Sequence, residues 1–191
     1  VFRDEFEGEN NSWKEKWNSA DNPTGHILSG RYPENVEVRN GFLQLINKKE
    51  KKNDQNWTSG SVWTKKQFDY GYFEARYRYA PAKGLNQSFW LMSHGTYRGG
   101  EGKFEIDINE GHYPREINTN YHYMQGEDHK SASKTYHVKN DLSEDFHVYG
   151  LKWNENELIY YFDGKVIRRV QNTFAHKVTP VRLSSAVIEW A

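Results

Sequence analysis

Three carboxylates lie close together in the segment Glu105-Ile-Asp-Ile-Asn-Glu110. On a β-strand, Glu105 and Asp107 would share a face because they are two residues apart. Glu110 is five residues from Glu105, and this odd separation would put it on the opposite face of a regular strand. A β-bulge near Ile108-Asn109 inserts one extra residue and would restore the parity. Carboxylates crowded in this way repel, so one can hold a proton while another stays ionised.

This chemistry suits a retaining glycosidase, which needs a nucleophile and an acid/base about 5–5.5 Å apart. Neighbouring same-face positions on one strand provide roughly that spacing. A solvated polar strand without chemistry is the plain alternative. A calcium loop fits less well, because Ile106 and Ile108 alternate as in a strand and the central glycine of an EF-hand is missing.

The elements that must position these acids are predicted to be strands almost throughout. Val36–Arg39, Asn40-Gly41 and Phe42–Ile46 form the pattern of a hairpin with a two-residue turn. Further strands are expected at 59–65, 72–79, 88–92, 104–110, 117–124, 146–153, 158–162, 165–170 and 181–190, with an Asp163-Gly164 turn between the strands at 158–162 and 165–170. The sequence therefore predicts an all-β sandwich or barrel of antiparallel sheets.

Composition excludes several functional classes. The chain has 191 residues, with 26 Lys and Arg against 26 Asp and Glu, so a general nucleic-acid binder is not expected. No apolar run is long enough to span a membrane. The absence of cysteine excludes disulfides and a thiol nucleophile. Aromatic residues make up 16% of the chain, more than a core of this size needs, and rings outside the core are candidates for stacking on sugars.

The acid motif resembles the bulged catalytic signature of glycoside hydrolase family 16. Five further segments resemble strands of that family in the same order: Phe2–Phe6, Gly71–Arg76, Ser88–Met92, Phe146–Trp153 and Tyr161–Val166. Because they span most of the chain, a chance match is not expected.

This resemblance implies a concanavalin A-like β-jelly roll, a sandwich of two curved antiparallel sheets with a concave substrate cleft. It implies retaining endo-hydrolysis of a β-linked polysaccharide, with Glu105 as the nucleophile and Glu110 as the general acid/base. Asp107 would hold the nucleophile and share a proton with it. We expect one catalytic domain over residues 1–191 that continues past Ala191 in a longer protein. A secreted, cell-surface or periplasmic monomer is expected, with a polysaccharide as its partner.

The substrate is less sharply indicated. Asn86–Trp90 and Thr58–Thr64 resemble agarase- and porphyranase-like members, which cut red-algal galactans. The W-P-x-x-G run that laminarinase-like members carry before the first catalytic glutamate is missing. A galactan is therefore favoured over a β-1,3-glucan, and carrageenans stay open. A non-catalytic lectin and a transglycosylase remain alternatives.

Several residues outside the acid motif are candidates for binding the substrate. Trp57 lies in a polar segment, predicted to be a loop, where a ring has no core to join. Trp90 would be core by its pattern, whereas the resemblance places it in the cleft. His122 shares a face with Asn120 and Met124 on the strand after the acids, where it could bond a sugar hydroxyl or a carboxylate, or serve only as a structural histidine.

The remaining candidates lie nearer the ends of the chain and in predicted loops. Arg31 and Arg98 could meet a sulfate group if the galactan is sulfated, although solvated loop charge is the plainer role. Glu189 and Trp190 are further candidates for the cleft. No cofactor or catalytic metal is required. A structural calcium ion stays open, because Asp4, Glu5 and Glu7 offer oxygen ligands, with surface charge as the alternative.

Overall fold

The computed structural model describes residues 1–94 and 102–190, and the chain is nearly all-β. Arg98 and Ala191 lie outside the described residues. The helices in the described part are two 3₁₀ turns, at Ser12–Glu15 and Pro33–Asn35. None of the helices there could cross a bilayer. The strands are β1 (Trp17–Ser19), β2 (Ser29–Arg31), β3 (Val36–Arg39), β4 (Phe42–Leu45), β5 (Trp57–Ser59), β6 (Ser61–Thr64), β7 (Gly71–Tyr77), β8 (Leu85–Met92), β9 (Lys103–Gly111), β10 (Glu116–Gln125), β11 (Asp128–Ser131), β12 (Lys134–His137), β13 (His147–Trp153), β14 (Glu157–Phe162), β15 (Lys165–Gln171) and β16 (Val181–Val187).

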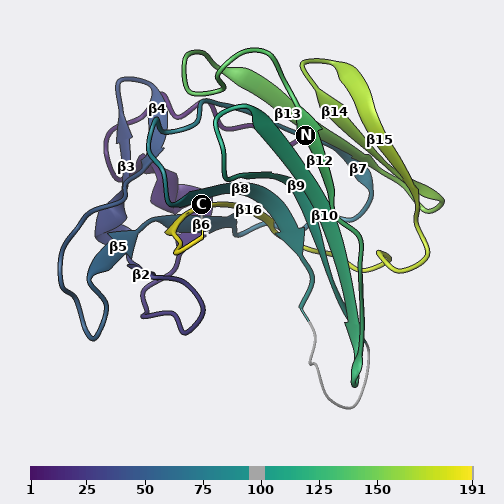
Figure 1. Ribbon diagram of the computed structural model, residues 1–191, viewed down its shortest axis with the longest axis horizontal. Coiled ribbons are helices and arrows are strands. Elements are labelled where there is room, and N and C mark those ends of the chain that lie inside the picture. Colours follow the sequence, from purple (N-terminus) through teal and green to yellow (C-terminus); the bar gives the residue numbers. More distant parts are fainter. Residues whose placement is uncertain (95–101, 191) are drawn as a thin grey trace. The chain divides into compact units, whose positions relative to one another are not determined.

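Contacts between residues divide the chain into two compact units. The first unit comprises residues 1–66, 84–86 and 182–190, and the second comprises 67–83, 87–94 and 102–181. Each unit is built from its own pairings of strands, and Figure 1 labels most of these strands.

In the first unit, β6 lies between β1 and β16 and pairs antiparallel with both. β2 and β5 form a short parallel pair, and β3 and β4 form the predicted hairpin. Asn40 and Gly41 have φ values of 55° and 75°, as a two-residue turn requires. The prediction of this hairpin is confirmed.

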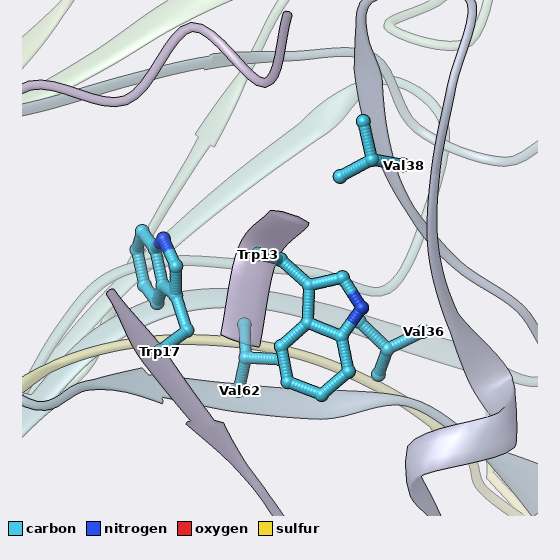
Figure 2. Packing of buried hydrophobic residues seen from close by; sticks show 5 residues of the cluster. All are labelled: Trp13, Trp17, Val36, Val38 and Val62. Atoms are coloured by element: carbon cyan, nitrogen blue, oxygen red, sulfur yellow. The ribbon is translucent and has the colours of Figure 1, made fainter. Parts of the chain in front are cut away.

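The core of the first unit gathers two indole rings and three valines. Figure 2 shows Trp13 and Trp17 with Val36, Val38 and Val62, which come from the first 3₁₀ turn, β1, β3 and β6. Val62 faces this core from β6, so Ser61 and Trp63 point to the opposite face of the strand. This second face of β6 therefore remains available for other contacts.

The second unit contains two antiparallel sheets. One has β9 between β8 and β10, with β11 and β12 both pairing with β10. The other has the order β15-β14-β13-β7, and its Asp163-Gly164 turn has φ values of 45° and 75°. The sheets stack face to face, because the Phe104 ring of β9 meets the Trp153 ring of β13 at 5.7 Å. Tyr160 of β14 also donates to the backbone oxygen of Asn120 in β10.

The strand predictions hold for the long strands and need correction at the short ones. The short strands β1, β2, β5, β11 and β12 were not expected. Trp57 and Arg31 were predicted in loops, yet Trp57 begins β5 and Arg31 ends β2, where backbone bonds between the two strands order both segments. The last predicted strand, 181–190, ends at Val187, so Glu189 and Trp190 follow it as exposed residues.

Two of the acids near the amino terminus are already bonded to protein groups. The Asp4 carboxylate accepts hydrogen bonds from the Trp17 indole and the Phe6 amide, at 2.9 and 3.1 Å. Glu5 pairs with Arg3 at 2.6 Å. These contacts explain Asp4 and Glu5 as structural and surface charge, which was the alternative to a calcium site.

Candidate active site

A β-bulge interrupts β9 between the acids. On the β10 side, Glu105 and Asp107 lie opposite His122 and Asn120, but Glu110 lies opposite Asn118, a shift of one residue. The ladder with β8 shifts at the same place, between Asp107 and Asn109. Ile108 is therefore the extra residue, and the predicted bulge is confirmed.

Asn109 is the residue that pins the bulge. Its side chain is 0% exposed, and its amide donates to the Tyr77 and Tyr79 hydroxyls at 2.6 and 2.7 Å. Its side-chain oxygen accepts the backbone N–H of Asn118 at 3.2 Å. Tyr77 and Tyr79 are in turn stacked on Tyr149 of β13. The bulge is thus tied to a ring layer in the core as well as to the neighbouring strand.

The bulge places all three acids on one face of the sheet. Phe104 and Ile106 are buried on the opposite face, which leaves Glu105 and Asp107 together. Glu110 interacts electrostatically with Asp107 and with His122 from beyond the bulge. The shared surface inferred from the spacing is therefore present.

Asp107 is the buried member of the group, only 3% exposed. Burial raises the pKa of its carboxyl well above the ordinary value, and the Glu110 and Glu105 carboxylates raise it further. A hydrogen bond joins it to Glu105. The raised pKa favours the protonated Asp107 carboxyl, which can donate this bond to the Glu105 carboxylate.

His122 approaches the acids from β10 and is held in a chain of side chains. The backbone N–H of Tyr121 bonds to the Asn120 side-chain oxygen at 2.9 Å, so the Asn120 amide nitrogen faces His122 and donates to its Nε2 at 2.8 Å. His122 Nδ1 then donates to Nε2 of His129 at 2.8 Å. Burial is the main cause that lowers the pKa of His122, and the charge of the nearby His129 lowers it further. A neutral His122 therefore lies with Nε2 at 3.7 Å from Asp107.

The sequence does not point to two histidines of the site, one beside Glu110 and one beside His122. His112 Nε2 lies 3.9 Å from a Glu110 carboxylate oxygen, and burial lowers the pKa of this imidazole. The spacing of two residues after Glu110 is a signal that could have pointed to it. His129 had no such signal, because only the β10–β11 pairing brings it to His122.

Trp90 lies directly beside the acids. In the β8–β9 ladder it is opposite Asp107, and its neighbours Phe89 and Leu91 are buried on the other face, 1% and 0% exposed. The half-buried ring therefore shares the face of the acids. The apolar pattern predicts a core residue, but the ring is only half-buried and lies on the face of the acids, and a role of Trp90 in the substrate cleft stays a prediction.

The other substrate-binding candidates belong to the first unit. Trp57 is half-buried, and the Lys49 ammonium lies 5.8 Å from its ring centre. Arg31 pairs through its backbone with Asn22. Trp190 is 62% exposed. The structure thus brings together Glu105, Asp107, Glu110, Trp90 and His122 in the second unit, and it describes Trp57, Arg31, Glu189 and Trp190 separately from them.

Three residues of the site form a candidate group for binding a metal ion. Glu105, Asp107 and His122 offer ligand atoms within 4.8 Å of one another. However, His122 Nε2 already accepts the Asn120 amide, and Asp107 is bonded to Glu105. The nitrogen of His122 that faces the acids is thus used in a hydrogen bond, and the raised pKa of Asp107 favours a neutral carboxyl, which is a poor metal ligand.

This arrangement can carry out acid-assisted substitution at a sugar carbon. A protonated carboxyl supports one carboxylate as a nucleophile, while a third acid across the bulge can donate and recover a proton. The fold and the site together define a glycoside hydrolase. Comparison with protein families gives the same result: the chain belongs to the glycosyl hydrolases family 16, whose model matches residues 29–189. The jelly-roll fold and the family resemblance are both confirmed.

Individual relatives differ in their substrates. Beta-porphyranase B of Zobellia galactanivorans is 31% identical over 87% of this chain and 66% of that protein. Its crystal structure superposes with a TM-score of 0.85 at 25% identity, covering 98% of this chain and 80% of that one. An endo-1,3-beta-glucanase (laminarinase) catalytic domain from Thermotoga petrophila gives a TM-score of 0.84 at 25% identity, covering all of this chain and 87% of that one. The chain spans about half to two thirds of the length of the first curated relatives it matches.

Proposed function

We propose that this protein is a retaining endo-glycosidase that cuts internal β-linkages of a red-algal galactan of the agarose or porphyran type. The observation that carries the proposal is the bulge in β9, which sets Glu105, Asp107 and Glu110 on one face. The similarity to a porphyranase supports the choice of a galactan. Because a polysaccharide does not cross a membrane, we propose that the protein acts outside the cytoplasm. We also propose that it acts as a monomer.

In the first step, the Glu105 carboxylate attacks the anomeric carbon while Glu110 protonates the departing glycosidic oxygen. The hydrogen bond from Asp107 orients Glu105 and disperses its charge. A covalent glycosyl-enzyme results. In the second step, Glu110 takes a proton from water, which attacks the same carbon and releases Glu105, so the configuration is retained.

Two substitutions test these roles. Glu105→Gln and Glu110→Gln should each lower the release of reducing ends by about 10²- to 10⁴-fold, while thermal unfolding stays cooperative. Agarose, porphyran, carrageenans, laminarin and lichenan form the substrate panel. Full activity of either folded variant would refute the mechanism.

Chemical rescue separates the two roles. With an activated glycoside, azide should restore turnover of Glu105→Ala and give a glycosyl azide of inverted configuration. The same reagent should give a product of retained configuration with Glu110→Ala, because the nucleophile is still present. The reverse pattern would exchange the two assignments.

Endo-β-1,3-glucanase activity is the second candidate, and the structural similarity to the laminarinase domain favours it. Cleavage of laminarin but of none of the galactans would establish it. A lectin would bind a polysaccharide without cleaving it, and a transglycosylase would reveal itself by transfer to an added acceptor sugar.

A further inference from the structure

Two histidines lie side by side next to the acid group, and one of them has no role in the reaction described above. His122 Nδ1 and His129 Nε2 are 2.8 Å apart, and the centres of the two rings are 5.1 Å apart. In the β10–β11 ladder, His122 lies opposite Ser131 and His129 lies opposite Met124. The two histidines are therefore diagonal neighbours on one face of the sheet, a separation that aromatic side chains can span.

The two rings differ in exposure. The His122 side chain is 24% exposed, whereas His129 belongs to the exposed strand β11. An exposed histidine on a short hairpin strand is most simply a solvated residue. The His129 ring, however, is aimed at a residue of the site within hydrogen-bonding distance, so its effect on the acids would pass through His122.

The hydrogen-bond chain through these rings has one direction. Because the Asn120 amide donates to Nε2 of His122, this nitrogen must carry a lone pair. A neutral imidazole holds a single N–H, so its proton lies on Nδ1 and needs an acceptor. Nε2 of His129, at 2.8 Å, is that acceptor. Asn120 and His129 thus fix the tautomer of His122 from its two ends.

The tautomer of His122 matters because its Nε2 faces Asp107. The Asp107 Oδ2 atom lies 3.7 Å from this nitrogen, is buried, and has no hydrogen-bond partner within the part of the chain that the structure describes. A lone pair on Nε2 cannot donate to this oxygen, and it therefore favours the neutral carboxyl. A proton on Nε2 would instead stabilise an ionised Asp107, which could no longer donate to Glu105.

We propose that His129 is a positioning residue for hydrolysis, which accepts the Nδ1 proton of His122 and so keeps the lone pair of its Nε2 toward Asp107. Asp107 then remains able to donate its hydrogen bond to Glu105. This role rests on the proposed function, in which Glu105 is the nucleophile. Because His129 acts through another side chain, it should affect kcat and leave KM nearly unchanged.

The tautomer can be measured without substrate. In protein labelled with ¹⁵N-histidine, long-range ¹H–¹⁵N spectra at about pH 8, above the ordinary histidine pKa of about 6.5, distinguish a ring protonated at Nδ1 from one protonated at Nε2. The His122→Gln variant identifies the His122 signals by their loss. We expect the Nδ1–H form in the wild type and a shift towards the Nε2–H form in His129→Ala. The Nδ1–H form should return in His129→Gln, whose amide oxygen can accept the same proton.

Activity should follow the tautomer. The loss of one hydrogen bond corresponds to about a 3- to 10-fold change in rate, so kcat of folded His129→Ala should fall by about that factor. The assay is reducing-end release from the polysaccharide of the panel that the wild type cuts, which is porphyran or agarose on the proposed function. His129→Gln should recover most of the wild-type kcat.

His137→Ala is the matched control. His137 is an exposed histidine of β12, which also pairs with β10, and its Nδ1 lies 3.6 Å from a Glu116 carboxylate oxygen. Its removal should leave both kcat and the His122 spectrum unchanged. Thermal unfolding of each variant shows whether it is folded.

Several results would overturn the role of His129. A wild-type His122 with its proton on Nε2 would reverse the hydrogen-bond chain. An unchanged spectrum or an unchanged kcat in His129→Ala would leave His129 as a surface residue, as would an equal loss of kcat in His129→Gln or in His137→Ala. If the wild type cut none of the polysaccharides, the proposed function would fail, while the spectra would still decide whether His129 fixes the tautomer.

Discussion

Replacing Asn109 with alanine should damage both the stability of the fold and the alignment of Glu110. The side chain makes three hydrogen bonds in the core, two to tyrosine hydroxyls and one to the Asn118 N–H. At about 1 kcal/mol each, their loss should lower the free energy of unfolding by about 3 kcal/mol. For a chain of this length, each kcal/mol lowers Tm by about 2–4 °C, so Tm should fall by about 6–12 °C.

The activity of the remaining folded protein should also fall. Without the Asn109 side chain, the two hydrogen bonds that tie the bulge to Tyr77 and Tyr79 are lost, so the backbone that carries Glu110 can relax. A misplacement of about 1 Å in a catalytic group can reduce the rate about 10²-fold. The expected result is a fall in kcat of that order at a temperature well below Tm.

Asn172→Ala provides the matched control. Asn172 is also buried, and its side chain makes four hydrogen bonds, with Asn154, twice with Ala175 and, at 3.4 Å, with the Phe174 N–H. It should lose a similar amount of stability in urea unfolding and keep the wild-type kcat. If Asn109→Ala were as active per folded molecule as Asn172→Ala, or lost less than about 1 kcal/mol, the reasoning about the bulge would be refuted.

Three further predictions concern the neighbours of the bulge. Folding raises the pKa of Asp107, so the contribution of this carboxyl to stability is fully present below the ordinary carboxyl pKa of about 3.9 and is lost as pH rises through the folded value. Asp107→Asn cannot ionise, so its Tm advantage should grow with pH in thermal melts from pH 4 to 9, and a constant difference would contradict this. Protonation of His112 at acid pH places a cation 3.9 Å from Glu110 and favours the ionised carboxylate, so His112→Gln should retain kcat to lower pH than the wild type. Superimposable pH profiles of the two proteins would count against that role. Trp90→Ala should raise KM by about 2- to 12-fold without changing the unfolding midpoint by much, because the half-buried ring contributes stacking rather than core packing. An unchanged KM, measured by reducing-end release, would remove Trp90 from the substrate site.

The long strands and the bulge could be predicted from the sequence because both follow from the alternation of side chains between the two faces of a strand. Alternation marks β9 and β10 clearly, and the odd spacing of Glu105 and Glu110 requires one inserted residue if the acids are to meet. The Asn40-Gly41 turn is equally local, since its positive φ values suit those two residue types.

The contacts that hold the site could not be predicted in the same way. Asn109 bonds tyrosines about thirty residues away, and no spacing rule connects them. His129 reaches His122 only through the β10–β11 pairing. Arg31 was placed in a loop because β2 is three residues long, too short for alternation to be visible. Tertiary partners decided each of these positions.

The bulge also explains why two acids of one short motif differ in environment. Asp107 lies before the inserted residue, between Trp90 and Asn120 in the ladders on its two sides, and its side chain is 4% exposed. Glu110 lies after it, near the end of β9, with its side chain 25% exposed. Water therefore reaches Glu110 and hardly reaches Asp107, and this burial is the main cause of the raised pKa of Asp107. This difference in environment fits the proposed double displacement, which gives the two acids different roles beside Glu105.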